Sequence, residues 1–256
     1  MPSITHSVTR SDRQQRAPRQ SREKPPFVLV HGAWHGGWCW KKVVPLLRAA
    51  GHEVFTPTLT GLGERVHMLA PEINLTTHID DVLGVLAYED LCDVVLVGHS
   101  YGGMVISGVA ERAGARLAQV VYLDAYLPED RKALRDYAAG DFLDELVTTH
   151  GEGWRVPPFL VAHDFGVTDP GDAAWVNERL GDQPYQTFTE PLVLAADAAD
   201  DIPRAYILTT QDTFVPHAAR AQQAGFGYEE LFSAGHDSMV TQPTALAQVL
   251  LHLVPY

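Results

Sequence analysis

A short apolar run that leads into a glycine-flanked serine is the feature that most constrains the fold of this chain. Residues 94–97 are continuously apolar, as expected for a strand that is buried on both faces of a parallel sheet. Gly98-His99-Ser100-Tyr101-Gly102 follows at once, and apolar spacing predicts a helix over residues 101–112. A G-x-S-x-G motif between a strand and a helix is typical of a nucleophile elbow. The pattern therefore predicts an α/β architecture with Ser100 at the carboxyl edge of its sheet.

A steric argument explains why this motif has glycine at two positions. Side chains at Gly98 and Gly102 would collide with neighbouring backbone in a tight strand-to-helix turn. The amino end of the following helix also favours negative charge that develops near Ser100. The simpler alternative is a structural turn whose serine has no catalytic role. The succession of strand, turn and helix favours a catalytic serine.

Short β-rich runs alternate with helical stretches through most of the chain, which predicts a parallel sheet with crossover helices. The expected strands are residues 27–30, 54–56, 94–97, 120–123, 206–209 and 229–231. The expected helices are residues 42–50, 77–88, 101–112, 217–224 and 243–253. We therefore expect an α/β core of about six mostly parallel strands with flanking helices, formed by residues 25–127 and 204–256.

The alternation stops between residues 128 and 203, where Pro, Gly and Asp interrupt any regular succession of strands and helices. The segment also carries several aromatic residues, Trp154 among them, which suggests burial. An irregular surface excursion without a role is the alternative. We expect an inserted cap over residues 128–203 that acts as a substrate lid, with Trp154 among the substrate-binding residues.

Charge and length exclude several classes of function. The chain has 256 residues and a formal net charge of -13, which disfavours nucleic acid as a partner because phosphates are bound mainly through Lys and Arg. Residues 1–24 are the exception, since basic residues outnumber acidic ones there. This polar segment is expected to be a disordered tail rather than a nucleic-acid or membrane arm.

The apolar runs are far shorter than the roughly 20 residues that span a bilayer, so we expect no membrane association. The first residues lack the apolar core of a signal peptide, which makes the cytoplasm the default location. Cys39 and Cys92 have neither disulfide-scaffold nor metal-ligand spacing and are expected to be reduced. The sequence leaves open whether the chain forms a homodimer.

A serine nucleophile needs a histidine base and a carboxylate that orients it, and with this elbow the order along the chain is serine, acid, histidine. His236 lies in a loop of small residues before the last expected helix and is the expected base. Asp212 directly follows an expected strand and is the expected acid. Asp124 ends the preceding strand and is the competitor; otherwise it binds substrate or anchors the cap.

The first strand leads into Gly32-Ala33-Trp34-His35-Gly36-Gly37, a glycine-rich turn with backbone amides free to donate. The amides of Ala33 and Tyr101 are the expected oxyanion donors, and the rings of Trp34 and Tyr101 are expected to line the pocket. A phosphate-binding loop is the alternative, but neither G-x-G-x-x-G nor a lysine-bearing P-loop is present. His31 and His35 lack a third ligand, so we expect no metal and no cofactor.

Residues 27–38, 50–54 and 94–104 together carry a specific resemblance. From about Phe27 to its end, the chain resembles the α/β-hydrolase branch that contains plant methylesterases, hydroxynitrile lyases and bacterial pyrethroid-hydrolase-like esterases. The resemblance implies the α/β-hydrolase fold with an inserted cap. It also implies a catalytic serine, aspartate and histidine, which match Ser100, Asp212 and His236.

Two positions depart from the hydroxynitrile lyases of this branch. Those enzymes characteristically place threonine where Gly32 stands, and lysine where Asp237 follows the histidine. A carboxylate in place of that lysine would oppose the charge of departing cyanide. Cyanohydrin cleavage is therefore disfavoured.

The expected activity is that of a serine esterase acting on a small, apolar or aromatic ester. Attack by Ser100 would form an acyl-enzyme, which water activated by His236 then hydrolyses. Two alternatives stay open: a lyase or cyclase that uses the same triad on a biosynthetic intermediate, and a receptor that has kept the fold.

Overall fold

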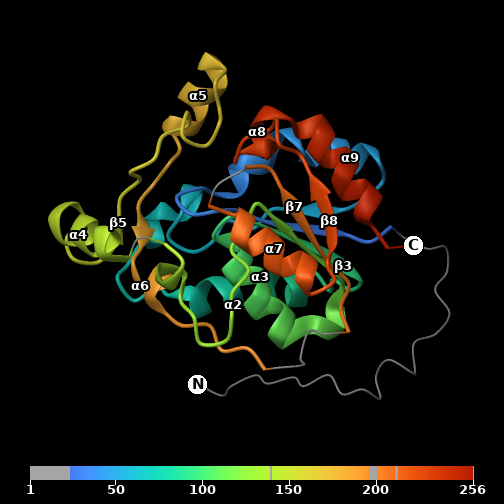
Figure 1. Cartoon of the computed structure of the whole chain (residues 1–256), viewed down its shortest axis with the longest axis horizontal. Helices are drawn as coiled ribbons and strands as arrows, with labels where there is room; N and C mark the ends of the chain where they lie inside the picture. Colours follow the sequence, from blue (N-terminus) through green and yellow to red (C-terminus); the bar gives the residue numbers. More distant parts are fainter. Residues whose placement is uncertain (1–23, 139, 196–200, 211–212, 256) are drawn as a thin grey trace.

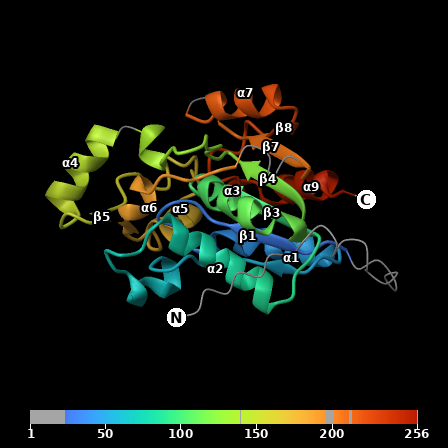
Figure 2. The same cartoon turned by 90° about the horizontal axis from the view of Figure 1, so that it is seen from below.

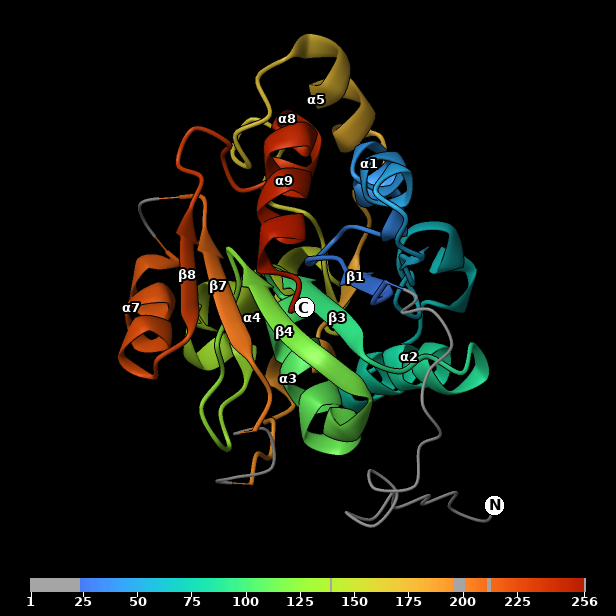
Figure 3. The ribbon, with the colours of Figure 1, turned by 90° about the vertical axis from the view of Figure 1, so that its right-hand side faces the viewer.

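The computed structural model describes residues 24–138, 140–195, 201–210 and 213–255. A six-stranded sheet runs through the molecule in the order β2-β1-β3-β4-β7-β8, and all its described pairings are parallel. Its strands are β1 Phe27–Val30, β2 Val54–Phe55, β3 Val94–His99, β4 Leu117–Leu123, β7 Arg204–Leu208 and β8 Gly227–Glu230. This is the parallel sheet that the sequence predicts, and Figure 3 shows its order from β8 to β1.

Burial along the sheet follows the apolar pattern of the sequence. β1 and β3 are buried along their whole length, whereas the edge strand β8 is intermediate or exposed at every position. The pairing of Val30 with Gly98 places the ends of β1 and β3 side by side. Because parallel strands end at the same edge, the loops that follow β1, β3, β4 and β7 meet there.

Helices flank this sheet (Figure 2). They are α1 Val44–Ala49, α2 Leu75–Tyr88, α3 Gly102–Ala113, α7 Val215–Gln223, α8 Ser238–Thr241 and α9 Pro243–Leu253. Short 3-10 helices occupy η2 Gly37–Lys42, η3 Gly63–Met68, η4 Gly114–Arg116 and η5 Leu134–Asp136. α2 begins two residues before the expected helix, because the Asn74 side chain accepts a hydrogen bond from the amide of Thr77 and caps it.

The segment expected to form a cap contains α4 Gly140–His150, β5 Arg155–Val156, α5 Pro170–Asn177, β6 Gln183–Pro184 and α6 Gln186–Thr189. These elements lie along one side of the molecule, away from α9 (Figure 1). β5 and β6 form an antiparallel pair of their own. Arg155 binds Asp182 across this pair at 2.7 Å and Glu152 at 2.6 Å. The limits 128–203 and the role of a lid stay predictions.

Three further sequence expectations concern the amino-terminal tail, membrane spans and the two cysteines. The tail expected over residues 1–24 lies outside the described residues except for Lys24. Within the described part of the chain, no helix is both long and apolar enough to cross a membrane. Cys39 and Cys92 are both free thiols.

The close approach of α3 to the end of β4 gives a test of the packing. A Cβ at Gly103 would lie 2.1 Å from the carbonyl oxygen of Tyr126, whereas a Cβ at Gly84 meets nothing within 4 Å. We expect Gly103→Ala to lower the free energy of unfolding by about 1–3 kcal/mol, because backbone must move. The matched Gly84→Ala variant should be neutral or gain about 0.5–1 kcal/mol from helix propensity. Urea unfolding measures both, and equal stability of the two variants would contradict the packing described.

Candidate active site

Ser100 lies on a strained turn between β3 and α3. Its φ of 54° is in the left-handed region, which is uncommon for a residue with a side chain. A Cβ at Gly98 would lie 2.7 Å from the carbonyl oxygen of Gly102, and one at Gly102 would lie 2.9 Å from that of His31. Both glycines are therefore required by close backbone contacts, as the motif predicts. The amide of Ser100 donates to Leu123 at 3.2 Å, which ties the turn to β4.

The loop after β1, residues 31–36, carries Ala33 and Trp34 to the cavity that Ser100 lines, and we call it the oxyanion loop. Ala33 and Tyr101 both line that cavity. No described residue accepts a hydrogen bond from either amide. Two free N–H groups beside a nucleophile are what a developing oxyanion requires.

Trp34 connects the oxyanion loop to the cap segment. Its φ of 63° is left-handed, so the residue needs external support. Three hydrogen bonds supply it: its amide donates to Gln183 Oε1 at 3.2 Å, its indole to Val156 O at 3.0 Å, and its carbonyl accepts from Gly181 at 3.0 Å. Gln183 is fully buried. The cap segment thus holds the residue next to Ala33.

His236 lies in the loop between β8 and α8, residues 231–237, which we call the histidine loop. Its Nδ1 forms a 2.7 Å hydrogen bond with Oδ2 of Asp124, whose side chain is fully buried. Phe214 stacks on the His236 ring, with centroids 4.9 Å apart and planes at 4°. With Nδ1 engaged, Nε2 is the atom of His236 left for proton transfer.

Asp124 accepts further hydrogen bonds besides the one from His236. The amides of Thr209 and Thr210 donate to its Oδ1 at 2.9 and 3.2 Å, and the Thr210 hydroxyl donates to Oδ2 at 2.9 Å. Burial alone would raise the pKa of this carboxyl, but the His236 contact and these donors outweigh it and lower the pKa. Asp124 is therefore held as a carboxylate under the histidine ring.

Asp212, the acid expected from the sequence, lies outside the described residues. Its place as the triad acid stays a prediction, and the competitor Asp124 is the carboxylate that contacts His236 in the structure. The sequence analysis also considered Asp124 as a substrate-binding residue. Among the described residues that line the cavity Asp124 is absent, because its carboxylate lies buried beneath His236.

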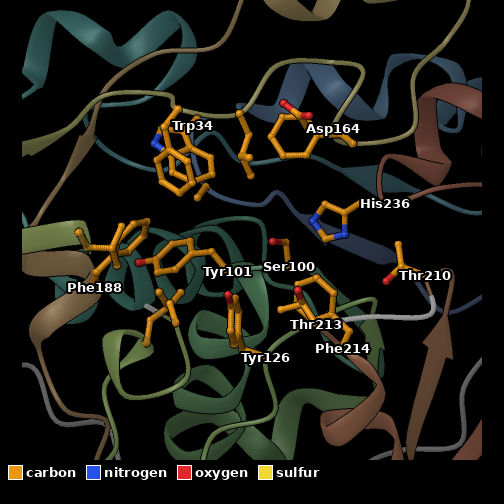
Figure 4. A pocket seen from close by; sticks show the side chains of 17 residues that line it. Trp34, Ser100, Tyr101, Tyr126, Asp164, Phe188, Thr210, Thr213, Phe214 and His236 are labelled. Atoms are coloured by element: carbon orange, nitrogen blue, oxygen red, sulfur yellow. The ribbon is translucent and has the colours of Figure 1, made fainter. Parts of the chain in front are cut away.

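A cavity of about 310 Å³ opens above Ser100. Figure 4 shows Ser100 near its centre, with His236 on one side and the ring of Tyr101 on the other. Seven aromatic residues line the wall: Trp34, Tyr101, Tyr126, Phe159, Phe165, Phe188 and Phe214. The polar groups besides Ser100 and His236 are Asp164, Thr210 and Thr213. A small apolar molecule with an aromatic portion fits this lining.

The sequence analysis expected three aromatic residues in this wall. Trp34 and Tyr101 line the cavity, whereas Trp154 is not among its described lining residues, and substrate binding by these residues stays a prediction. The guanidinium of Arg155 lies 5.4 Å from the centroid of the Trp154 ring, which gives that ring a different partner. Tyr126 and Phe214 were missed, although each follows an expected strand at the same sheet edge as Ser100 and Asp124.

The described part of the site has no side chains arranged to hold a metal. Across the described ranges, no group of three or more His, Cys, Asp or Glu side chains could hold an ion. His31 illustrates this, because its Nε2 accepts the amide of Leu59 at 3.1 Å and its Nδ1 bonds to Gly32 O at 2.8 Å. Both ring nitrogens of His31 are thus occupied by backbone.

Comparison of this sequence with known proteins identifies its family. The model of the Alpha/beta hydrolase family matches residues 27–249. The chain belongs to the alpha/beta hydrolase family. It is 40% identical over 242 residues to the carbendazim hydrolyzing esterase of Nocardioides sp. (strain SG-4G), covering 89% of this chain and 98% of that one. Salicylic acid-binding protein 2 of Nicotiana tabacum is 30% identical over 258 residues, covering 91% and 98%.

Solved structures agree on the fold of this alpha/beta hydrolase. An extracellular alpha/beta-hydrolase from a Paenibacillus species superposes with a TM-score of 0.77 at 23% identity, covering 91% of this chain and all of that one. The similar sequences include esterases and methylesterases. The chain is thus a carboxylic ester hydrolase of this family, which confirms the fold, the family branch and the enzyme class expected from the sequence.

The contact between Gln183 and Trp34 gives a test of the link between cap and oxyanion loop. Gln183→Met keeps the size of the side chain but leaves the Trp34 amide without its acceptor. We expect kcat for p-nitrophenyl acetate to fall about tenfold, with a smaller change in KM, because oxyanion donors act mainly in the transition state.

Gln119→Met is the matched control, since Gln119 is also buried and its Oε1 has no hydrogen-bond partner. It lies on β4, outside the cavity wall. Equal kcat values for the two variants would rule out a link through Gln183.

Proposed function

We propose that this hydrolase cleaves the carboxylic ester of a small apolar or aromatic molecule through an acyl-enzyme on Ser100. The observation that carries the proposal is the convergence of Ser100, His236 and the free amides of Ala33 and Tyr101 on one cavity. Ser100 Oγ attacks the ester carbonyl while His236 Nε2 takes its proton, and the two amides stabilise the oxyanion.

Collapse of the tetrahedral intermediate completes acylation. His236 returns its proton to the leaving alcohol, which breaks the carbon–oxygen bond of the ester. Water then enters, loses a proton to His236 and hydrolyses the acyl group from Ser100. The balance is one ester and one water to one acid and one alcohol, so no further reactant is needed.

Asp124 is the acid that we assign to this mechanism. Its 2.7 Å contact with Nδ1 supports this role, because it orients the ring and favours the imidazolium that forms during attack. Buried donors from Thr209 and Thr210 keep the carboxylate in place. Asp212 remains the choice implied by the family resemblance, and variants of both aspartates distinguish the two.

Cavity size and lining support a small, largely apolar substrate. A volume of about 310 Å³ is at the lower end of the roughly 300–1,000 Å³ of ligand sites. Trp34 lies across the cavity from Tyr126 (Figure 4), and its ring packs against Phe159 in a T-shaped arrangement with centroids 5.1 Å apart. The printed name of the 40% identical relative makes carbendazim the first individual compound to test.

The surroundings of Gly32 and Asp237 give no support for cyanohydrin cleavage. A Cβ at Gly32 would lie 2.9 Å from Cβ of Ser100, so a threonine there would displace the nucleophile. Asp237 is fully buried and contacts His35 instead of the cavity. The position where lyases of this branch carry a lysine is therefore turned away from the reacting atoms.

A cytoplasmic location and the absence of a nucleic-acid partner stay predictions of the sequence, and the formation of a homodimer stays open. The described structure contributes only that none of its helices could cross a membrane.

Hydrolysis of short-chain p-nitrophenyl esters tests the proposed function. We expect turnover by the wild type and its loss, by about 10⁴-fold or more, in Ser100→Ala. A fluorophosphonate probe should label Ser100 in the wild type only. Hydrolysis that survives Ser100→Ala would overturn the proposal, whereas labelling without turnover of any ester would favour the lyase or cyclase alternative.

Asp124→Asn and Asp212→Asn separate the two acids. We expect Asp124→Asn to lower kcat by about 10³–10⁴-fold, because the amide favours the wrong tautomer of His236. Asp212→Asn should change kcat by less than about tenfold. The reverse order would assign the role to Asp212, and circular dichroism of both variants controls for misfolding.

Asp164 gives a test of substrate charge. It is the one carboxylate among the described lining residues, and its Oδ2 accepts the amide of Val161 at 2.8 Å. We expect Asp164→Asn to raise kcat/KM for an anionic ester about two- to fivefold relative to its neutral analogue, a small effect because the residue is exposed to solvent. Raised ionic strength should shrink the difference between wild type and variant. An unchanged ratio would show that Asp164 does not influence substrate charge.

A further inference from the structure

Three buried polar residues are sequence neighbours of the catalytic groups. His35 follows Ala33 by two residues, His99 precedes Ser100, and Asp237 follows His236. Their exposed fractions are 2%, 0% and 0%. The proposed mechanism uses none of them, yet they meet in the core directly behind the site.

His35 contacts acceptors with both of its ring nitrogens. Nδ1 lies 2.7 Å from the carbonyl oxygen of Ala33, and Nε2 lies 3.1 Å from Oδ2 of Asp237. Neither oxygen can donate a proton, since one is a carbonyl and the other belongs to a carboxylate. Both nitrogens must carry hydrogen to satisfy both contacts, and an imidazole with two N–H groups is a cation.

We propose that His35 is held as an imidazolium between the Ala33 carbonyl and the Asp237 carboxylate, and that this buried ion pair positions the oxyanion loop against the histidine loop. His35 and Asp237 are positioning residues in this arrangement, because neither touches the substrate cavity. The proposal deepens the function proposed above and rests on it.

The surroundings of His35 favour a cation. Its ring stacks on Trp38, with centroids 5.2 Å apart and planes at 20°, and the face of an indole attracts positive charge. Phe165 closes the other side in an edge arrangement at 5.4 Å. Asp237 supplies the compensating negative charge that a buried cation needs.

Burial favours the neutral form of the other titratable groups around His35, which are His31, Cys39 and His99. His99 Nε2 donates to the His236 carbonyl at 3.0 Å and lies 4.0 Å from Asp237 Oδ1, so its proton goes to the backbone. Burial, followed by the nearby histidines, lowers the pKa of His99 well below its ordinary value. Burial also lowers the pKa of His31 to about 3 and raises the pKa of the Cys39 thiol.

The pKa of His35 moves the other way. Burial alone would lower it, but the charge of Asp237 and the hydrogen bonds to Asp237 and Ala33 raise the pKa above its ordinary value. A raised pKa means that the ion pair is complete at and below pH 6.5 and is lost as pH rises through the folded-state pKa. Deprotonation leaves a bare nitrogen facing an oxygen and breaks one of the two contacts.

The contact at Ala33 explains why this affects catalysis. The Ala33 carbonyl and the Trp34 amide belong to one peptide group, and His35 and Gln183 bind its two ends. That peptide directly follows the amide of Ala33 that we assign to the oxyanion hole. Its rotation would re-aim the donor, so loss of the imidazolium should lower kcat more than it raises KM.

Nitrogen-15 NMR of histidine-labelled full-length protein tests the charge without reference to activity. As the pH is raised, we expect both nitrogens of one histidine to keep imidazolium shifts after the exposed histidines have lost theirs, and this signal to be absent in His35→Gln. A His35 that loses its proton no later than the exposed histidines would overturn the proposal. Because this measurement on the wild type stands alone, it remains decisive if a variant fails to fold.

The pH dependence of kcat for a p-nitrophenyl ester tests the positioning role. We expect the wild type to lose activity on the alkaline side, and Asp237→Asn to move that limb down by about one to three pH units, because the neutral amide no longer stabilises the cation. His35→Gln should have a lower kcat and no such limb. His252→Gln, which alters an exposed residue of α9, is the control and should match the wild type.

Failure of this inference differs from failure of the proposed function. Turnover that depends on Ser100, with an alkaline limb unmoved in Asp237→Asn, would overturn the role of the ion pair alone. Absence of any turnover that depends on Ser100 would instead reject the esterase mechanism, while the NMR result would still decide whether His35 is charged.

Discussion

The geometry of the site depends most on the hydrogen bonds that the buried carboxylate of Asp124 accepts. It accepts hydrogen bonds from the end of β7, through Thr209 and Thr210, and from the histidine loop, through His236. Asp124 itself ends β4, whose Leu123 carbonyl accepts the amide of Ser100. One buried charge therefore fixes the relative positions of three loops that are far apart in the sequence. Its left-handed φ of 42° is a local strain that these contacts offset.

Around this centre the site is assembled from backbone as much as from side chains. Ser100 points out of its turn because Gly98 and Gly102 permit close backbone contacts. The groups that we propose as oxyanion donors are the amides of Ala33 and Tyr101, and the backbone that carries them sets their directions. Support for these loops comes from behind, through His35 and Asp237, and from the cap segment, through Gln183. The chemistry of the family is thus held by contacts that no short motif records.

Local patterns predicted the centre of the sheet well, because β1 and β3 are short apolar runs that are buried along their whole length. Residues 94–97 could be placed from their apolar run alone, and the elbow glycines pointed to Ser100 as the candidate nucleophile. The cap was harder to predict, because Trp154 and Phe188 are equally apolar in the sequence, yet only Phe188 lines the cavity. The pairing of His236 with Asp124 could not be chosen from sequence either, since Asp124 and Asp212 both follow strands that end at one edge. Contacts such as that of His35 with Asp237 join residues 202 positions apart and have no local signature.

The left-handed Trp34 has a consequence for how enzymes of this architecture diverge. Its conformation is maintained by Val156, Gly181 and Gln183, all of which lie in the most irregular part of the chain. A chimera that exchanges this region between relatives would replace the three partners of Trp34 but keep Trp34 itself. We expect such an exchange to alter turnover together with substrate preference, unless position 34 and its three partners are exchanged together.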